Sequence, residues 1–321
     1  MNDFRKVDEH GFVIPPSFGE VHSPEDLPPT RKPISLRTKR LVIFGVLFGI
    51  VIPVVFGPKI LSFARESLSQ WLLARAERKI FADDYSGAIS DLNWSLDWNP
   101  NAWYSYMLRG EVRLELNDLE GSLTDYNKLI DLLSSQDEVR RRRRPLDRNS
   151  VLAEAYSSRS WVLTRLGRGR EAIDDASHAV KLVPSPLHLN SRAYVRAQVN
   201  LELKEGLDDI DKALAQTNND KANLLDTRGY LLHLLNRNEE ALTMLDDAIK
   251  VMEHYNRALV FQHDPFDPRS VGARRREIDH ALAVMYHHRG LVNEKLGNKE
   301  AASQDFALGE KHGYDPAKGV L

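Results

Sequence analysis

One spacing of small residues recurs along most of this chain and constrains its fold more than any other feature. Ser160 lies in an apolar-periodic stretch, Ala172 follows twelve residues later, and Ala179 follows after seven more. Small side chains are needed where two helix backbones cross closely, so this segment predicts a helical hairpin. The same spacing returns at Ala76, Ala88 and Ser95; at Gly110, Ser122 and Leu129; at Ala193, Gly206 and Ala213, with one residue inserted; at Gly229, Ala241 and Ala248; and at Gly290, Ala302 and Gly309.

A spacing that recurs at this interval predicts about six copies of one hairpin, each packed on the next. The predicted fold class is therefore all-α, an α-solenoid. The array is expected to run from 69 to 316, with a C-terminal tail at 317–321 and inserts at 137–152 and 257–282. The expected hairpins are 69–102, 103–136, 153–186, 187–220, 222–256 and 283–316.

An uncharged apolar run, Leu41 to Pro58, precedes the array. As a helix, its roughly 18 residues rise about 27 Å, which nearly matches a hydrocarbon core of about 30 Å. We expect an uncleaved transmembrane helix at 41–58, because the charged segment before it is too long for a signal peptide. The proline-rich segment 1–40 predicts a disordered tail, and 59–68 predicts a juxtamembrane helix or linker.

Basic residues near the two ends of the apolar run predict its orientation. Those on the N-terminal side are Arg31, Lys32, Arg37, Lys39 and Arg40, whereas Lys59 and Arg65 are the nearest on the other side. Basic flanks tend to stay in the cytoplasm. We therefore expect a single-pass membrane protein with a cytoplasmic N-terminus and an array on the non-cytoplasmic side.

The hairpins resemble the tetratricopeptide repeat (TPR) family, whose units of about 34 residues form two antiparallel helices. The resemblance rests on the small-residue spacing, on an aromatic residue or leucine four residues into the second segments, and on the prolines that end several units. It covers nearly all of the chain after the apolar run and indicates a membrane-anchored member of the family. The residues that carry it besides the small ones are Leu92, Tyr126, Leu245, Phe306, Pro100, Pro184 and Pro316.

The resemblance implies that the first helix of each hairpin lines a concave groove for a partner protein or peptide. Some family members clamp a peptide's terminal carboxylate with Lys and Asn, but Leu73, Glu77 and Leu108 occupy the matching places here. A receptor of that type is therefore not expected. The groove residues carried over are Tyr104, Met107, Glu111, Ser157, Ser158, Trp161, Tyr194, Asp226, Thr227, Tyr230, His233, His287, His288 and Glu294.

A row of arginines and a row of aspartates follow the same repeat. The arginines immediately precede the first small residue of each hairpin, and the aspartates lie three residues after the small residue that opens the second segment. A guanidinium can donate two parallel hydrogen bonds to a carboxylate, so the rows predict a structural ladder of ion pairs. In the fifth hairpin Met244 takes the aspartate position, with Asp246 and Asp247 nearby, so Arg228 is expected to be the unpaired arginine. The ladder residues are Arg75, Arg109, Arg159, Arg192, Arg228, Arg289, Asp91, Asp125, Asp175, Asp209 and Asp305.

Several function classes find no support in the sequence. The chain has no cysteine, which excludes disulfides, thiolate metal sites and cysteine nucleophiles. It carries no phosphate-binding loop, nucleophile elbow or HExxH motif, and its neighbouring histidines lack a carboxylate at metal-ligand spacing. We expect no enzyme activity, cofactor, metal or small-molecule substrate. The net charge of −2 argues against nucleic acid. The run Arg140 to Arg144 is interpreted as a solvated loop, and contact with anionic lipid headgroups or an acidic partner is the alternative.

The predicted function is that of a membrane-anchored interaction scaffold. It would bind a partner protein or peptide in its groove and act in recruitment or complex assembly. The alternative is a constitutive structural subunit of a membrane complex with no exchangeable peptide ligand.

Overall fold

The computed structural model describes residues 57–135, 145–217, 221–261 and 268–314. The chain divides into two compact units, Met1–Phe63 and Ala64–Leu321. The predicted tail 1–40 and all but the last two residues of the predicted span 41–58 lie outside the described residues. Within the described residues, no helix has the length and apolar character that crossing a membrane requires.

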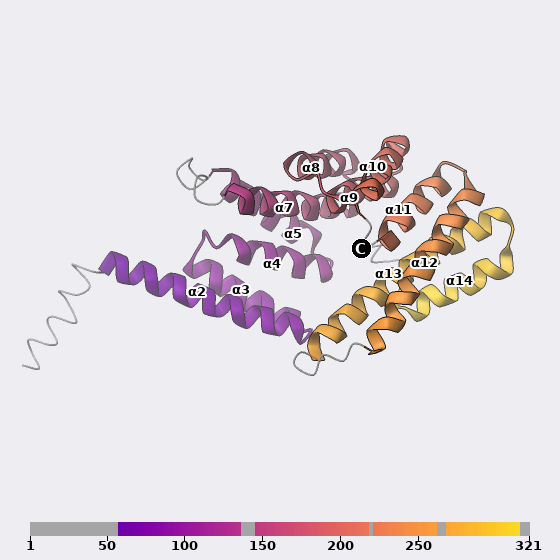
Figure 1. The fold of residues 1–321 in the computed structure, drawn as a ribbon. Helices are drawn as coiled ribbons and strands as arrows, with labels where there is room; N and C mark the ends of the chain where they lie inside the picture. The colour runs from indigo at the N-terminus through magenta and orange to yellow at the C-terminus, as the bar shows by residue number, and fades with distance from the viewer. Residues whose placement is uncertain (1–56, 136–144, 218–220, 262–267, 315–321) are drawn as a thin grey trace, which may run out of the picture. The chain divides into compact units, whose positions relative to one another are not determined.

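The described part of the second unit is built from helical hairpins that follow one another along the chain (Figure 1). Helices pair within the hairpins α4/α5, α7/α8, α9/α10, α11/α12 and α13/α14, and the second helix of each packs against the first helix of the next. First helices also contact one another, as in α7 with α9 and α9 with α11. The helices are α2 (Gly57–Phe81), α3 (Tyr85–Trp98), α4 (Trp103–Glu115), α5 (Leu119–Ser135), α7 (Pro145–Arg165), α8 (Gly169–Leu182), α9 (Pro186–Gln198), α10 (Leu203–Gln216), α11 (Lys221–Leu234), α12 (Asn238–Phe261), α13 (Pro268–Leu296) and α14 (Lys299–Lys311).

This architecture confirms the all-helical solenoid that the repeat predicted. The helices differ from the predicted inserts in their extent, because α7 begins at Pro145 and α13 begins at Pro268. Both prolines lie within the predicted inserts. Proline is nevertheless well suited to the first turn of a helix, where its fixed φ fits and its missing N–H would have no intrahelical partner.

Each hairpin turns at a residue in the left-handed region. These residues are Asp83, Asn117, Gly167, Asn200, Asn236 and Gly297. Their φ angles, and that of Glu202 in the fourth hairpin, lie between 52° and 83°. Asn, Asp and Gly tolerate this conformation best, and it ends a helix by returning backbone N–H groups to its last carbonyls. One such bond recurs in every turn, for example from the Asp118 N–H to the Arg113 carbonyl at 2.8 Å and from the Arg237 N–H to the Leu232 carbonyl at 2.9 Å. The inserted residue of the fourth hairpin lies in its turn, where Glu202 adds a second positive φ.

The repeated small residues lie where the paired helices touch. Ala76, Ala88, Ala172 and Ala179 are fully buried. In the second hairpin the hydroxyl of Ser122 donates to the carbonyl of Gly110 at 2.7 Å, so the two backbones are separated by little more than a hydrogen bond. A larger side chain at these crossings would force the helices apart.

The arginines and aspartates form bidentate pairs within hairpins. Arg109 with Asp125 and Arg159 with Asp175 have donor–acceptor distances of 2.6–2.9 Å. Arg192 with Asp209 makes the same pair, as do Arg75 with Asp91 and Arg289 with Asp305. The aspartates are almost completely buried, so the guanidinium compensates a charge that would otherwise be costly.

The same arginines also reach the preceding hairpin. Arg109 donates to Asn93 at 2.7 Å, and Arg159 donates to Asn127 at 2.8 Å. Each of these acceptors lies two residues after the aspartate of the preceding second helix, a position that the sequence interpretation did not identify. One guanidinium therefore joins three helices, two of its own hairpin and one of its neighbour.

Arg228 corrects the expectation of an unpaired arginine. Its own hairpin offers Met244 in place of the aspartate, but Arg228 donates to Asp211 of the preceding hairpin at 3.0 Å. Asp246 is likewise taken by the following arginine, Arg289, at 2.8 Å. The prediction considered pairing within a hairpin only and therefore missed the contact between hairpins.

A pair of matched substitutions tests the close crossing of α11 and α12. A Cβ atom added at Gly229 would lie 2.7 Å from Leu245 Cγ, whereas one added at Gly272 in α13 would meet no atom within 4 Å. We expect Gly229→Ala to lower the free energy of unfolding by about 1–3 kcal/mol through overpacking. Gly272→Ala should leave it unchanged or raise it by up to about 1 kcal/mol, because alanine favours the helix. Urea unfolding followed by circular dichroism measures both, and equal effects would contradict the assigned crossing.

Candidate functional site

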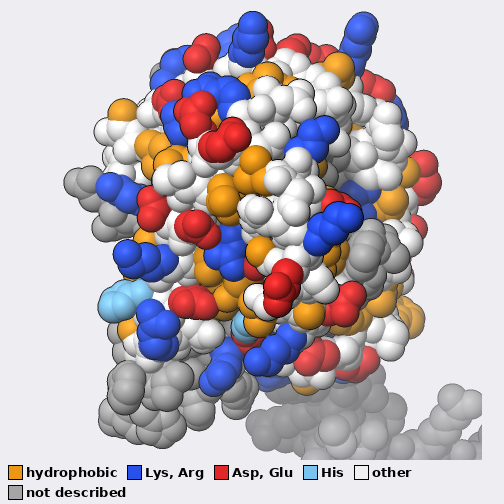
Figure 2. All heavy atoms as spheres, turned by 90° about the vertical axis from the view of Figure 1, so that its right-hand side faces the viewer, with side chains coloured by type: hydrophobic (Ala, Val, Ile, Leu, Met, Phe, Trp, Pro, Cys, Tyr) orange, Lys and Arg blue, Asp and Glu red, His pale blue; other side chains and the backbone are white. Residues whose placement is uncertain are grey.

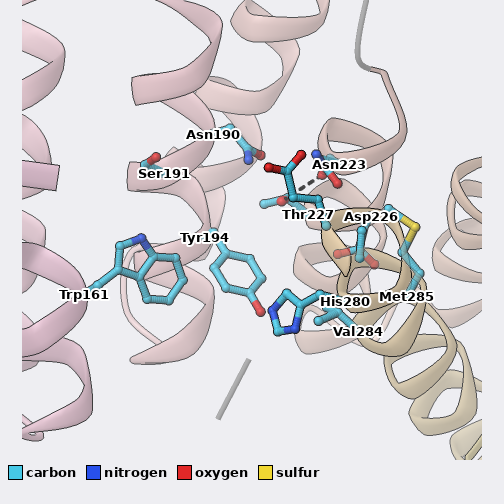
Figure 3. A pocket seen from close by; sticks show the side chains of 12 residues that line it. Trp161, Asn190, Ser191, Tyr194, Asn223, Asp226, Thr227, His280, Val284 and Met285 are labelled. Atoms are coloured by element: carbon cyan, nitrogen blue, oxygen red, sulfur yellow. Dashed lines mark hydrogen bonds between the residues drawn. The ribbon is translucent and has the colours of Figure 1, made fainter. Parts of the chain in front are cut away.

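The first helices of four hairpins enclose a pocket of about 310 Å³ in the second unit. Trp161 of α7 and Tyr194 of α9 form part of its wall, and α11 contributes Asp226 and Thr227. Figure 3 shows Trp161 across the pocket from Val284 of α13. The structure therefore brings together four of the predicted groove residues from three different hairpins.

An aromatic cluster extends from this pocket into the protein. The rings of Trp161 and Tyr194 have centroids 5.2 Å apart, and Tyr230 lies 6.3 Å from Tyr194. Tyr230 stacks on His288 with centroids 4.1 Å apart and an interplanar angle of 7°. Burial raises the pKa of Tyr230, as expected for a ring in an apolar setting. These contacts fix the relative positions of α7, α9, α11 and α13.

His288 is a correction to the predicted groove surface. Its side chain is 1% exposed, and its Nδ1 lies 2.9 Å and 3.1 Å from the two carboxylate oxygens of Asp226. The adjacent His287 lies on another face, where it stacks on Tyr314 at 4.0 Å and packs against Phe306. Burial, with a smaller contribution from His288, lowers the pKa of His287 to about 4. His288 therefore packs between hairpins, whereas His287 packs within the sixth hairpin.

A second group of predicted residues surrounds Tyr104 at the other end of the array. Burial raises the pKa of Tyr104, and the negative charges of Glu77 and Glu111 raise it further. Burial also raises the pKa of Glu111 to about 7, and the charge of Glu154 contributes. Carboxylates from α2, α4 and α7 therefore lie close enough to Tyr104 to affect its hydroxyl, and the charge of Glu154 also affects Glu111.

The remaining predicted groove residues have individual places. Met107 is 8% exposed and belongs to the core with Tyr126, so it is a second correction to the predicted surface. Ser157 Oγ lies 3.1 Å from Nδ1 of His188. His233 Nδ1 lies 2.8 Å from Oδ1 of Asn238 at the turn of the fifth hairpin. Ser158 is partly buried, and Glu294 is exposed.

Several pocket residues were missed by the sequence interpretation. Asn190 lies one turn before Tyr194 on α9, and Met285 lies one turn before the repeat's arginine on α13. A search for residues one helical turn from each predicted aromatic residue and from each arginine of the repeat could have found them. Glu277 and His280 lie in the predicted insert 257–282, before the predicted sixth hairpin, and the structure places both on α13.

Comparison with known proteins gives likenesses in structure alone. No family model matches the chain, and no curated protein matches it. RapI in its apo form is 10% identical and superimposes with a TM-score of 0.52, covering 78% of this chain and 98% of RapI. PilW, a widely conserved type IV pilus biogenesis factor, is 14% identical with a TM-score of 0.50, covering 74% and 90%. A tetratricopeptide repeat protein from Parabacteroides merdae is 16% identical with a TM-score of 0.48, covering 78% and 95%.

At these identities the likeness to RapI and PilW shows the fold alone. The described chain is a TPR-like α-solenoid, the class of protein that the repeat of small residues had indicated. Folds of this class present side chains of successive first helices on one surface, which is where the pocket lies.

The raised pKa of Glu111 makes a prediction about stability and pH. The unfolded carboxyl ionises near its model value of 4.5, whereas the folded carboxyl holds its proton until about pH 7. The native state therefore binds more protons between these values, and stability falls as pH rises through that range. Glu111→Gln should remove this loss and raise the free energy of unfolding at pH 8, relative to pH 5, by about 1–3 kcal/mol compared with the wild type.

Urea unfolding at the two pH values measures the effect. Glu310→Gln changes an exposed carboxyl on α14 and provides the control, with an unchanged pH dependence expected. A Glu111→Gln variant with the wild-type pH dependence would contradict the assigned burial of the carboxyl.

Proposed function

We propose that this protein is a membrane-anchored scaffold that binds a segment of a partner protein along the surface formed by its first helices. The observation that carries the proposal is the pocket itself, because α7, α9, α11 and α13 each supply part of its wall. No single hairpin could form it. The stacked array thus serves to hold side chains from distant parts of the sequence around one guest.

The character of the pocket suits recognition of a protein segment. Trp161 and Tyr194 offer large rings that lose little conformational entropy on binding, and polar groups lie beside them. The scaffold acts by binding and not by catalysis. Its partner is a protein or peptide, with no role for nucleic acid or a small-molecule substrate.

Membrane attachment is the second part of the proposal. It is supported by the charge-free sequence 41–58, which has the length of a bilayer span. The array lies on the non-cytoplasmic side, as the basic flank 31–40 suggests. Anchoring would confine the partner near the membrane and raise its effective concentration there.

Affinity capture with matched tryptophan variants tests this function. Full-length protein is captured from detergent-solubilised membranes, and co-purifying proteins are quantified by mass spectrometry. Trp161→Gln should reduce recovery of a partner by about tenfold or more, because aromatic anchors in pockets dominate binding energy. Trp94→Gln is the control, since Trp94 is exposed on α3 and does not line the pocket. Thermal unfolding by circular dichroism checks that both variants fold.

Two outcomes would contradict the proposal. The same partners recovered with Trp161→Gln and with the wild type would place binding outside the pocket and favour a constitutive structural subunit. Release of the chain from membranes by alkaline washing would exclude the anchor. If a variant that lacks 41–58 stays on the membranes in that wash as well as the full chain does, the anchor is also excluded.

A further inference from the structure

Apart from a histidine, the ionisable side chains on the described pocket wall are all acidic. Asp226 and Glu277 line it, and no Lys or Arg is among the described residues of its wall. On the face seen in Figure 2, by contrast, Lys and Arg side chains are interspersed with Asp and Glu. The pocket therefore favours a cationic guest electrostatically.

The ion-pair ladder explains why no arginine of the repeat lines the pocket. Each of its four helices carries an arginine of the repeat, but all four guanidinium groups are bound elsewhere. Arg159 pairs with Asp175 and Arg192 with Asp209, while Arg228 and Arg289 reach Asp211 and Asp305. All these aspartates belong to second helices. The repeat thus directs these arginines away from the pocket. Asp226 is held by Nδ1 of His288, and Glu277 is the exposed carboxylate on the wall.

The polar atoms at the pocket also require a guest that donates hydrogen bonds. The side-chain oxygen of Asn190 is buried and has no hydrogen-bond partner within the described structure. Glu277 is exposed at the rim, and its carboxylate can only accept hydrogen bonds, whereas the buried carboxylate of Asp226 already lies beside His288 Nδ1. A buried acceptor without a donor is costly, so a guest rich in N–H groups gains by filling the site.

The rest of the wall is apolar. Val284 and Met285 of α13 lie opposite Trp161 (Figure 3), and the volume of about 310 Å³ is at the small end for ligand pockets. Such a space suits one long side chain with an aliphatic stem and a polar head. A planar cation can in addition stack on the indole ring of Trp161.

We propose that this pocket binds an arginine side chain of the partner segment, with its stem against Val284 and Met285 and its guanidinium between Trp161, Asn190 and the carboxylate of Glu277. The inference rests on the proposed function and adds to it the side chain of the partner segment that the pocket selects. Arginine fits better than lysine, because its five N–H donors lie in one plane that can stack on Trp161 while reaching several acceptors.

Selection from randomised peptides tests the proposal. A phage library of nine-residue peptides is panned on the full-length chain, on Glu277→Arg and on the matched charge reversal Glu310→Arg, which lies on α14 away from the pocket. Wild type and Glu310→Arg should both enrich arginine at one fixed position. Glu277→Arg should lose that enrichment and favour Asp or Glu at the same position.

Fluorescence anisotropy with the best selected peptide then measures the guanidinium directly. Replacing its arginine by lysine or by neutral citrulline should weaken binding to the wild type by about tenfold. Equal affinity for the three peptides, or the same arginine motif from Glu277→Arg, would overturn the assignment. Peptides selected without an arginine position would also overturn it but leave the proposed function standing. Failure of the wild-type chain to select any peptide would contradict both.

Discussion

The structure depends on one contact that recurs in nearly every hairpin, an arginine of the first helix bound to an almost fully buried aspartate of the second. Small residues bring the two helices close, and the guanidinium neutralises the carboxylate that this closeness buries. In most hairpins the same group donates to the second helix of the preceding hairpin. Packing within a hairpin and stacking between hairpins are thereby joined through one side chain.

This arrangement also decides the chemistry of the inner surface. The arginines are held on the side of the second helices, so among the described residues the pocket between the first helices has Asp226 and Glu277 on its wall and no Lys or Arg. Aromatic contacts from Trp161 through Tyr194 and Tyr230 to His288 fix the helices around it. The ion-pair ladder and the proposed preference of the pocket for a cationic guest thus follow from the same repeat.

The sequence predicted the fold well because the repeat is short, local and multiplied. Hairpin positions followed from small residues, and the arginine and aspartate rows followed from their fixed offsets. The pocket was predicted only in part. Trp161 and Tyr194 could be identified, but the interior position of His288 depends on Asp226, 62 residues earlier in the chain. Glu277 was missed because it lies in the predicted insert 257–282, outside the hairpins from which the groove residues were chosen, whereas α13 runs through it from Pro268. Contacts between hairpins depend on how the units stack, and a single repeat does not contain that information.

A double-mutant cycle on Arg159 and Asp175 tests the central claim most directly. The free energies of unfolding are measured for the wild type, Arg159→Ala, Asp175→Ala and the double variant. The ladder predicts a coupling energy of about 1–3 kcal/mol, because each single variant leaves a charge of a bidentate, largely buried pair without its partner. The exposed pair Arg168 and Glu171 should couple more weakly. A coupling between Arg159 and Asp175 no larger than that of the exposed pair would contradict the account.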